Sequence, residues 1–130
     1  MSGEQIVARA RALVGARFRP QGRSVDGGYD CVGLVGEALG LGCPRADYRL
    51  RGGSREALGA ELAAAGLQRV CAAEPGDILV MRAGPEQLHL GIATGTGFVH
   101  ADARLRQVVD RPGAPPWPVL EVWRKGEGRG

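Results

Sequence analysis

Apolar side chains recur with a helical period in the first part of the chain. Between residues 2 and 14 they form one side of an expected helix, at Ile6, Val7, Ala10, Leu13 and Val14. Ser2 stands before this segment as a natural N-cap, and Gly15 follows it as a terminator. The pattern predicts a helix from Ser2 to about Val14.

Two more helices are expected before the middle of the chain. A loop at residues 19–29, rich in glycine, leads into a helix over residues 31–39 with Asp30 as its N-cap. Ser54 caps a third predicted helix, over residues 55–65.

After residue 75 the apolar positions fall in short runs bounded by turn residues, which is the pattern of β-strands. The candidate strands are residues 78–81, 88–94, 97–102, 106–110 and 119–123. Thr-Gly-Thr-Gly at 94–97 predicts a hairpin turn between the second and third candidates. Residues 112–118 contain four prolines and predict an extended connection.

Helices followed by an antiparallel sheet of about five strands predict an α+β domain. A chain of 130 residues can bury one hydrophobic core, so residues 1–130 are expected to form a single domain. We expect residues 125–130 to form a flexible tail.

Charge and hydropathy argue against two classes of partner. The chain has 17 Lys and Arg residues against 14 Asp and Glu residues, and this mild, interspersed excess does not predict nucleic-acid binding. The N-terminal segment has an early glutamate and no long apolar run, and no window reaches transmembrane length. We therefore expect synthesis in the cytoplasm without a signal peptide, and no membrane insertion.

The three cysteines, Cys31, Cys43 and Cys71, are an odd number and show no C-x-x-C spacing, which argues against a disulfide framework and a zinc ribbon. We expect Cys43 and Cys71 to be structural. Cys31 differs because it stands at the start of a predicted helix. There the backbone N–H groups and the helix dipole favour a thiolate and can hold an oxyanion.

The chain has two histidines, His89 and His100, and both fall on predicted strands joined by a tight turn. A thiol at a helix start followed by strand histidines is typical of papain-like hydrolases, in which His89 would be the base and His100 its orienting partner. Taken singly, each residue is more often structural than functional. A Cys-His-His zinc site is an alternative that needs a fourth ligand or an open water position.

Three segments carry a resemblance to a known family. They are Asp-Cys-Val-Gly-Leu-Val from Asp30, Pro-Gly-Asp-Ile-Leu-Val from Pro75, and His-Leu-Gly-Ile-Ala-Thr-Gly-Thr-Gly-Phe-Val-His-Ala from His89. In this order, over roughly residues 5–124, they resemble the NlpC-type family of papain-like peptidoglycan peptidases. With Phe-Arg-Pro-Gln-Gly-Arg-Ser from Phe18, the chain is most similar to the branch encoded among tail genes of phages and gene transfer agents.

The resemblance implies a papain-like fold with Cys31 as nucleophile, His89 as general base and then acid, and His100 as the third residue. Members of this family typically hydrolyse an amide bond in the stem peptide of the cell wall, commonly between D-glutamate and diaminopimelate. The implied mechanism passes through an acyl-enzyme and requires no metal or other cofactor.

The expected substrate pocket departs from that of the bacterial housekeeping members. In those enzymes an aspartate before the cysteine, a serine after it and an upstream tyrosine receive the free amino end of the stem peptide. Here Asp30 matches, whereas Val32 and Phe18 replace the two hydroxyl-bearing residues. A pocket without these hydroxyls should not select strongly for an ammonium group, so we expect stem peptides still attached to glycan to be accepted.

The resemblance to the tail-encoded branch implies a particle-borne enzyme with the stem peptide as substrate and tail-tip or hub proteins as partners. One alternative is a catalytically inactive module that binds the wall or has a structural role in the tail tip. Another is an amidase or acyltransferase, because acyl-enzyme chemistry does not specify the leaving group.

Overall fold

The structure is a computed structural model that describes residues 1–20, 22–24, 28–41 and 54–126, and Cys43 lies outside these ranges. The described part contains three helices and eight strands. In chain order they are α1 (Gly3–Ala12), β1 (Arg23–Ser24), β2 (Gly28–Tyr29), α2 (Cys31–Ala38), α3 (Arg55–Ala64), β3 (Leu67–Val70), β4 (Ile78–Gly84), β5 (Gln87–Ala93), β6 (Gly97–Asp102), β7 (Gln107–Pro112) and β8 (Val119–Lys125).

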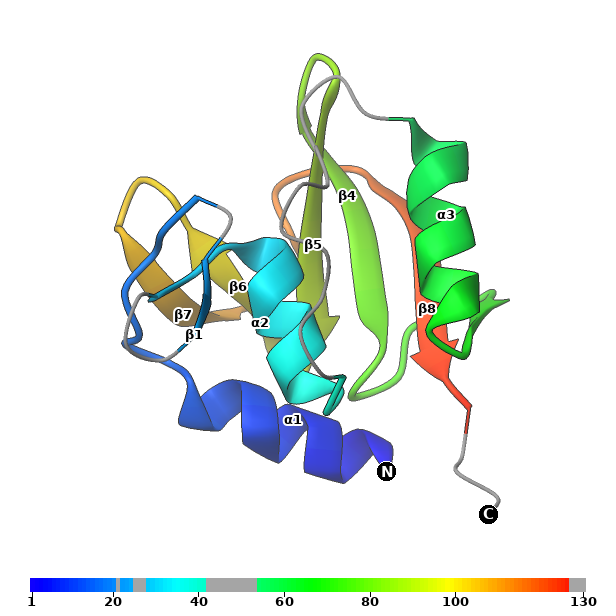
Figure 1. Ribbon diagram of the computed structural model, residues 1–130, viewed down its shortest axis with the longest axis horizontal. Helices are drawn as coiled ribbons and strands as arrows, with labels where there is room; N and C mark the ends of the chain where they lie inside the picture. Colours follow the sequence, from blue (N-terminus) through cyan, green and yellow to red (C-terminus); the bar gives the residue numbers. More distant parts are fainter. Residues whose placement is uncertain (21, 25–27, 42–53, 127–130) are drawn as a thin grey trace.

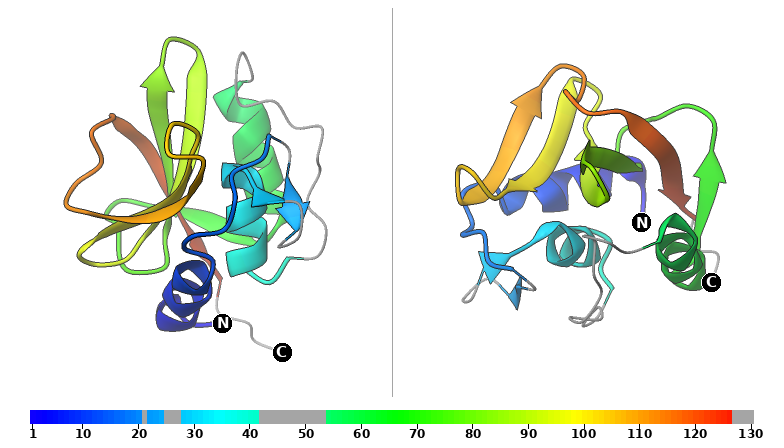
Figure 2. Two further views of the ribbon diagram at one scale, coloured as in Figure 1. Left: turned by 90° about the vertical axis from the view of Figure 1, so that its left-hand side faces the viewer. Right: turned by 90° about the horizontal axis from the view of Figure 1, so that it is seen from above.

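Six of these strands form one antiparallel sheet in the order β3-β8-β4-β5-β6-β7, while β1 and β2 pair with each other. Helix α2 lies in front of this sheet near its middle, α3 lies beside β8, and α1 crosses below α2 (Figure 1). Seen from above, α2 and α3 form a layer on one side of the curved sheet (Figure 2, right). The predicted α+β fold is confirmed.

The helix starts are fixed by the polar residues that the sequence singled out. Ser2 Oγ accepts from the Gln5 backbone N–H, and the Gln5 side chain accepts from the Ser2 backbone N–H, which completes a capping box. Asp30 caps α2 and Ser54 caps α3 in the same position. Each helix ends one or two residues before its predicted end because the next residue already forms the C-cap.

The main hydrophobic core lies between the helices and one face of the sheet. Alternate side chains of β4 and β5, such as Val80, Leu90 and Ile92, point to this side and are almost fully buried. They pack in one cluster with helix residues such as Leu34 and Leu58. This contact holds α2, and therefore the residue at its start, against the middle of the sheet.

A second, smaller apolar cluster lies on strand positions of the opposite parity. Its buried members are Leu79, Met81, Ala93 and Phe98. Trp117, from the connection between β7 and β8, packs against them together with Val122. The proline-rich connection at residues 112–118 thus brings a large aromatic side chain onto the sheet.

The edge strand β3 is the strand of the six-stranded sheet that the sequence pattern misses. Among its four residues Leu67 alone is buried, which is too little for a readable alternation. It pairs with β8 from Leu67 opposite Lys125 to Val70 opposite Val122, so the sheet has six strands rather than about five. Lys125 therefore belongs to β8 and donates to the Ala65 carbonyl at 2.9 Å. The predicted tail was wrong for this residue, and residues 127–130 lie outside the described ranges.

Two further expectations differ from the structure. The loop predicted at residues 19–29 contains β1 and β2, with Arg23 opposite Tyr29. Cys71, which we expected to be structural, is exposed after the end of β3 and contributes nothing to the core.

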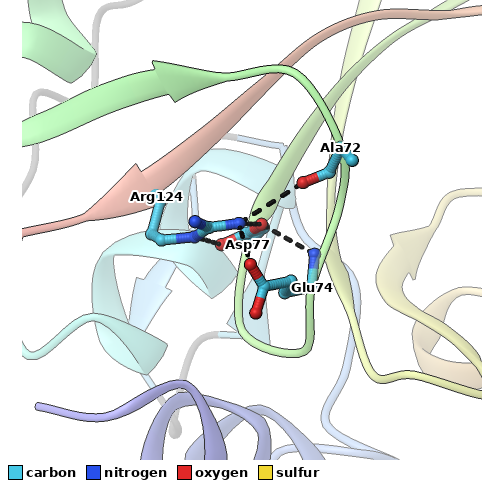
Figure 3. Close-up of polar contacts among 4 residues, drawn as sticks. All are labelled: Ala72, Glu74, Asp77 and Arg124. Carbon is cyan, nitrogen blue, oxygen red and sulfur yellow. Dashed lines mark hydrogen bonds and ion pairs between the residues drawn. The ribbon is translucent and has the colours of Figure 1, made fainter.

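An ion pair between the buried Asp77 and the partly exposed Arg124 lies where the chain enters β4 (Figure 3). The Asp77 carboxylate, 2% exposed, accepts from Arg124 Nε at 2.9 Å, from Arg124 Nη2 at 2.9 Å and from the Glu74 backbone N–H at 2.8 Å. Arg124 Nη2 also lies 2.9 Å from the Glu74 carboxylate and 3.3 Å from the Ala72 carbonyl. This network ties the end of β8 to the turn before β4.

Candidate active site

One cavity of about 820 Å³ brings together the start of α2, strands β5 and β6, and the connection from β7 to β8. Cys31, His89 and His100 all line it, so the three predicted catalytic residues share one space. Other wall residues that bear on its chemistry are Phe18, Asp30, Asp102, Arg104, Arg111 and Trp117.

Cys31 is the first residue of α2 and is 4% exposed. Asp30 Oδ1 accepts from the Gly33 backbone N–H at 2.9 Å and so holds the first turn of the helix. The Gly22 backbone approaches this turn so closely that a Cβ atom on Gly33 would overlap the Gly22 carbonyl oxygen. Glycine at 33 therefore lets the preceding loop reach the helix start, where the helix dipole favours a thiolate.

His89 and His100 meet at the place where β5 and β6 separate. The two strands pair at Ile92 with Val99 and at Ala93 with Phe98. At His89 and His100 the two strands are connected through their side chains, since His89 Nε2 lies 2.9 Å from His100 Nδ1. One of these nitrogens must donate to the other, which links the tautomers of the two rings.

Burial controls the charge of both imidazoles. It lowers the pKa of His89 from the usual 6.5 to about 4, helped by the neighbouring His100 and opposed by the charge of Asp102. The pKa of His100 is also lowered, by burial first, with Asp102 opposing the shift and Arg111 adding to it. Both rings are therefore neutral at neutral pH, which is the state that a general base requires.

Trp117 covers the histidine pair. Its ring centroid lies 5.3 Å from that of His89, 5.5 Å from that of His100 and 6.2 Å from that of Phe98, with steep interplanar angles. Phe98 in turn lies 4.9 Å from His100. The sequence pattern placed Trp117 only in an expected extended connection, since nothing in the local pattern shows where a proline-rich connection folds back.

Asp102 is a second site residue that sequence reasoning missed. Its side chain is 15% exposed, and Oδ2 lies 3.9 Å from His100 Nε2. Oδ1 accepts from the backbone N–H groups of Arg104 at 2.8 Å and Leu105 at 3.0 Å. The signal was available, because residues two apart on a strand share a face and Asp102 follows His100 by two.

Burial of Asp102 disfavours its ionised form, but other contacts outweigh this effect. The hydrogen bonds from the backbone of Leu105 and Arg104, together with the charges of His100 and Arg111, place the pKa of Asp102 below its ordinary value. The carboxylate is therefore charged at neutral pH.

Two arginines add positive charge to the cavity wall. Arg104 and Arg111 are exposed, and the Arg111 guanidinium lies 5.8 Å from the Trp117 ring centroid. An exposed guanidinium in a cleft can bind a carboxylate of a ligand.

The predicted substrate-binding residues separate in the structure. Phe18 and Asp30 line the cavity. Val32 is partly buried, packs against the main core and is not among the described residues that form the cavity wall.

Metal ligands and membrane-spanning helices are the two remaining features to consider in the described residues. Within residues 1–20, 22–24, 28–41 and 54–126, no three His, Cys, Asp or Glu side chains are grouped so that they could hold a metal ion. In the same part of the chain, no helix has the length and apolar character to cross a membrane.

Comparison with known proteins identifies the fold through solved structures. No family model matches the sequence, and no curated protein matches it. The structure of NlpC1 from Trichomonas vaginalis is similar to this chain with a TM-score of 0.69 and 22% identity. RipB of Mycobacterium tuberculosis, described as a peptidoglycan hydrolase, is similar with a TM-score of 0.64 and 22% identity. The P60 domain of a Mycobacterium avium subspecies paratuberculosis antigen is similar with a TM-score of 0.66 and 21% identity.

These similarities cover nearly all of this chain but unequal parts of the other proteins. The chain is covered to 95%, 94% and 97%, whereas the coverage of NlpC1, RipB and the P60 domain is 45%, 63% and 96%. The chain thus spans less than half of NlpC1 and 96% of the P60 domain. The fold is that of an NlpC/P60 domain.

Proposed function

We propose that this protein is a cysteine peptidase that hydrolyses an amide bond in the stem peptide of peptidoglycan. The observation that carries the proposal is the convergence of Cys31 at a helix start with the bonded pair His89 and His100 in one cavity. The fold is shared with domains described as peptidoglycan hydrolases, which supports the substrate class.

The proposed mechanism follows from which imidazole nitrogen of His89 is left to accept a proton. His89 Nε2 is engaged by His100, so His89 Nδ1 is the nitrogen that takes the Cys31 proton. The thiolate attacks the amide carbon, and backbone N–H groups at the start of α2 hold the oxyanion. His89 returns the proton to the leaving amine, and water then hydrolyses the thioester.

The stem peptide fits the charge of the cavity. It carries free carboxylates, and the wall offers the exposed guanidinium groups of Arg104 and Arg111. Phe18 forms part of the wall without a hydroxyl group, which supports the acceptance of stem peptides still attached to glycan. Isolated tripeptide stems cut much faster than intact sacculi would contradict this part of the proposal.

The decisive experiment is digestion of purified diaminopimelate-type sacculi, with the released fragments resolved by mass spectrometry. Wild type should release peptide fragments whose masses identify the bond, and Cys31→Ala should release none. Cys71→Ala is the matched control, since Cys71 is an exposed thiol far along the chain and should leave the digest unchanged. Sacculus binding without cleavage by wild type would favour a wall-binding module instead.

The reactivity of the thiol tests the enzyme class without any substrate. At neutral pH, Cys31 should react with iodoacetamide faster than the exposed Cys71, although Cys31 is 4% exposed, because the helix dipole favours its thiolate. A Cys31 that reacts more slowly than Cys71 would count against an activated nucleophile.

We further propose that the protein acts as part of a phage-like tail, bound to tail-tip or hub proteins. The support is the sequence similarity of the segment from Phe18 to the tail-encoded branch. Proteomic analysis of purified particles should detect the chain, and particles that lack it would remove this part of the proposal.

A further inference from the structure

We propose that Asp102 is a positioning residue that fixes the tautomers of both histidines and so makes His89 Nδ1 the base. The proposal rests on the proposed function, since it assigns a fourth member to the same site. It begins from His100 Nε2, which is the one buried side-chain nitrogen or oxygen among the described residues without a hydrogen-bond partner. A buried polar atom without a hydrogen-bond partner is costly, and in a native structure it calls for a structural or functional explanation.

Asp102 provides that preference. Its Oδ2 is the carboxylate oxygen that approaches His100 Nε2, at 3.9 Å. A proton on Nε2 places a positive hydrogen toward the carboxylate, whereas a bare Nε2 places a lone pair toward the same negative charge. Electrostatics therefore favours the proton on Nε2 and leaves His100 Nδ1 bare.

The bond between the rings carries this choice to His89. A bare His100 Nδ1 can only accept, so His89 Nε2 must be the donor across the 2.9 Å contact. His89 then carries its proton on Nε2 and presents an unprotonated Nδ1. The opposite choice at His100 would place a proton on His89 Nδ1 and remove the base.

The geometry shows that Asp102 is held in place for this role. Two backbone N–H groups, of Arg104 and Leu105, bind Oδ1 and leave Oδ2 directed toward the histidine. The other charged group that acts on the pair is Arg111 of β7, which helps to keep Asp102 ionised. Trp117 covers both rings and limits competition by water.

Two substitutions separate charge from tautomer. Asp102→Ser retains an oxygen that can accept from the loop backbone but removes the charge, so it should give a mixture of tautomers. Asp102→Asn retains the oxygen toward the loop and places an amide N–H₂ donor toward His100 Nε2. That donor requires a bare Nε2, so the asparagine variant should invert both tautomers and be the less active of the two.

The test is nitrogen-15 NMR of the imidazole rings of the whole protein at pH 7. The chain has two histidines, so the spectrum contains two ring systems, and His89→Gln assigns them. Wild type should show both rings protonated at Nε2, and Asp102→Asn should show both protonated at Nδ1. A wild-type His100 protonated at Nδ1, or tautomers that are the same in all variants, would overturn the proposal.

Activity on sacculi gives a second readout. Relative to wild type, kcat/KM should fall about 10-fold in Asp102→Ser and roughly 10²-fold in Asp102→Asn. Asp110→Asn is the matched control, because this carboxylate on β7 pairs with Arg11 at the surface and its loss should leave kcat/KM unchanged. Equal losses in the serine and asparagine variants would contradict the tautomer argument.

The two readouts distinguish the proposals. The expected tautomers in a wild type that cuts no sacculi would retain the role of Asp102 and reject the peptidase. Cleavage by wild type with unchanged tautomers in the variants would retain the peptidase and reject the role of Asp102.

Discussion

Two polar clusters, each built around a buried side chain, lie at opposite ends of β5, and the hydrogen-bonding groups of those side chains are satisfied to different degrees. At one end the Asp77 backbone carbonyl accepts from the Ala93 N–H at 2.9 Å, and the Asp77 carboxylate accepts three hydrogen bonds. At the other end, His89 bonds to His100 at 2.9 Å, while His100 Nε2 has no hydrogen-bond partner in the described structure and faces Asp102 at 3.9 Å.

The difference separates a stabilising cluster from the cluster that we propose to be reactive. In the Asp77 cluster both carboxylate oxygens accept hydrogen bonds, and these bonds hold β8 against the turn before β4 (Figure 3). The carboxylate is therefore already occupied and is poorly suited to bind a ligand. The histidine cluster lines a cavity and retains a nitrogen without a partner. Incomplete satisfaction in a buried site is the pattern expected where a protein gives up stability for chemistry.

The largest effect that follows from this comparison is the loss of His89, the proposed general base. His89→Gln keeps a side-chain N–H that can donate to His100 but removes the lone pair on Nδ1. We expect kcat/KM on sacculi to fall by roughly 10³-fold, about 4 kcal/mol, because general-base catalysis contributes on this scale. Chemical denaturation at pH 7 should show an unchanged or slightly higher free energy of unfolding. A variant that keeps most of its activity would show that His89 is not the base.

The second prediction concerns the Asp77 cluster, where a substitution should affect stability rather than activity. Asp77→Ala removes the charged acceptor of three hydrogen bonds and should lower the free energy of unfolding by about 3 kcal/mol. The activity of the folded fraction should not change, since Asp77 lies outside the cavity that holds Cys31. Glu74→Ala is the control, because its carboxylate is 68% exposed and its ion pair should contribute little. Equal destabilisation by both variants would show that the buried hydrogen bonds do not dominate.

The sequence predicts the fold well where local signals are strong. Ser2, Asp30 and Ser54 mark the three helix starts, because capping is a short-range interaction that residue type reveals. The strands β4 to β8 are visible as apolar runs. Strand β3 is not visible, because one buried residue, Leu67, gives no alternation and its partner strand β8 lies far away in the sequence, with Leu67 opposite Lys125.

The site is predicted in its parts but not in its surroundings. Cys31, His89 and His100 could be found from residue type and position, and the structure places all three on one cavity. Trp117 could not be found, because its place depends on how a connection between two strands folds back. The spacing of Asp102 to His100 predicts that the two share a strand face. A carboxylate near a strand end is nevertheless too common a pattern to be singled out without the geometry.

The acid dependence of stability also distinguishes the clusters. The pKa of His89 in the folded protein is about 4, below 6.5, so on acidification the unfolded chain binds this proton first. The free energy of unfolding should therefore fall as the pH falls from 6.5 to about 4, by about 2 kcal/mol more in wild type than in His89→Gln. Denaturation curves across this pH range measure the difference. Parallel pH profiles for the two proteins would contradict the lowered pKa.

The smallest predicted effect concerns the cover over the histidine pair. Trp117→Leu keeps an apolar side chain but removes most of the ring surface that lies against His89 and His100. Because burial is the main cause of the lowered pKa of His89, water at this position should raise that pKa from about 4 toward 6.5. NMR titration of the ring should show the rise, kcat/KM at pH 5 should fall several-fold, and unfolding should become easier by about 1 kcal/mol. Leu105→Ala is the control and should leave the pKa of His89 unchanged, since Leu105 lines the same cavity but is 60% exposed. If the pKa of His89 stays the same in Trp117→Leu, the strands and α2 rather than the tryptophan keep water from the base.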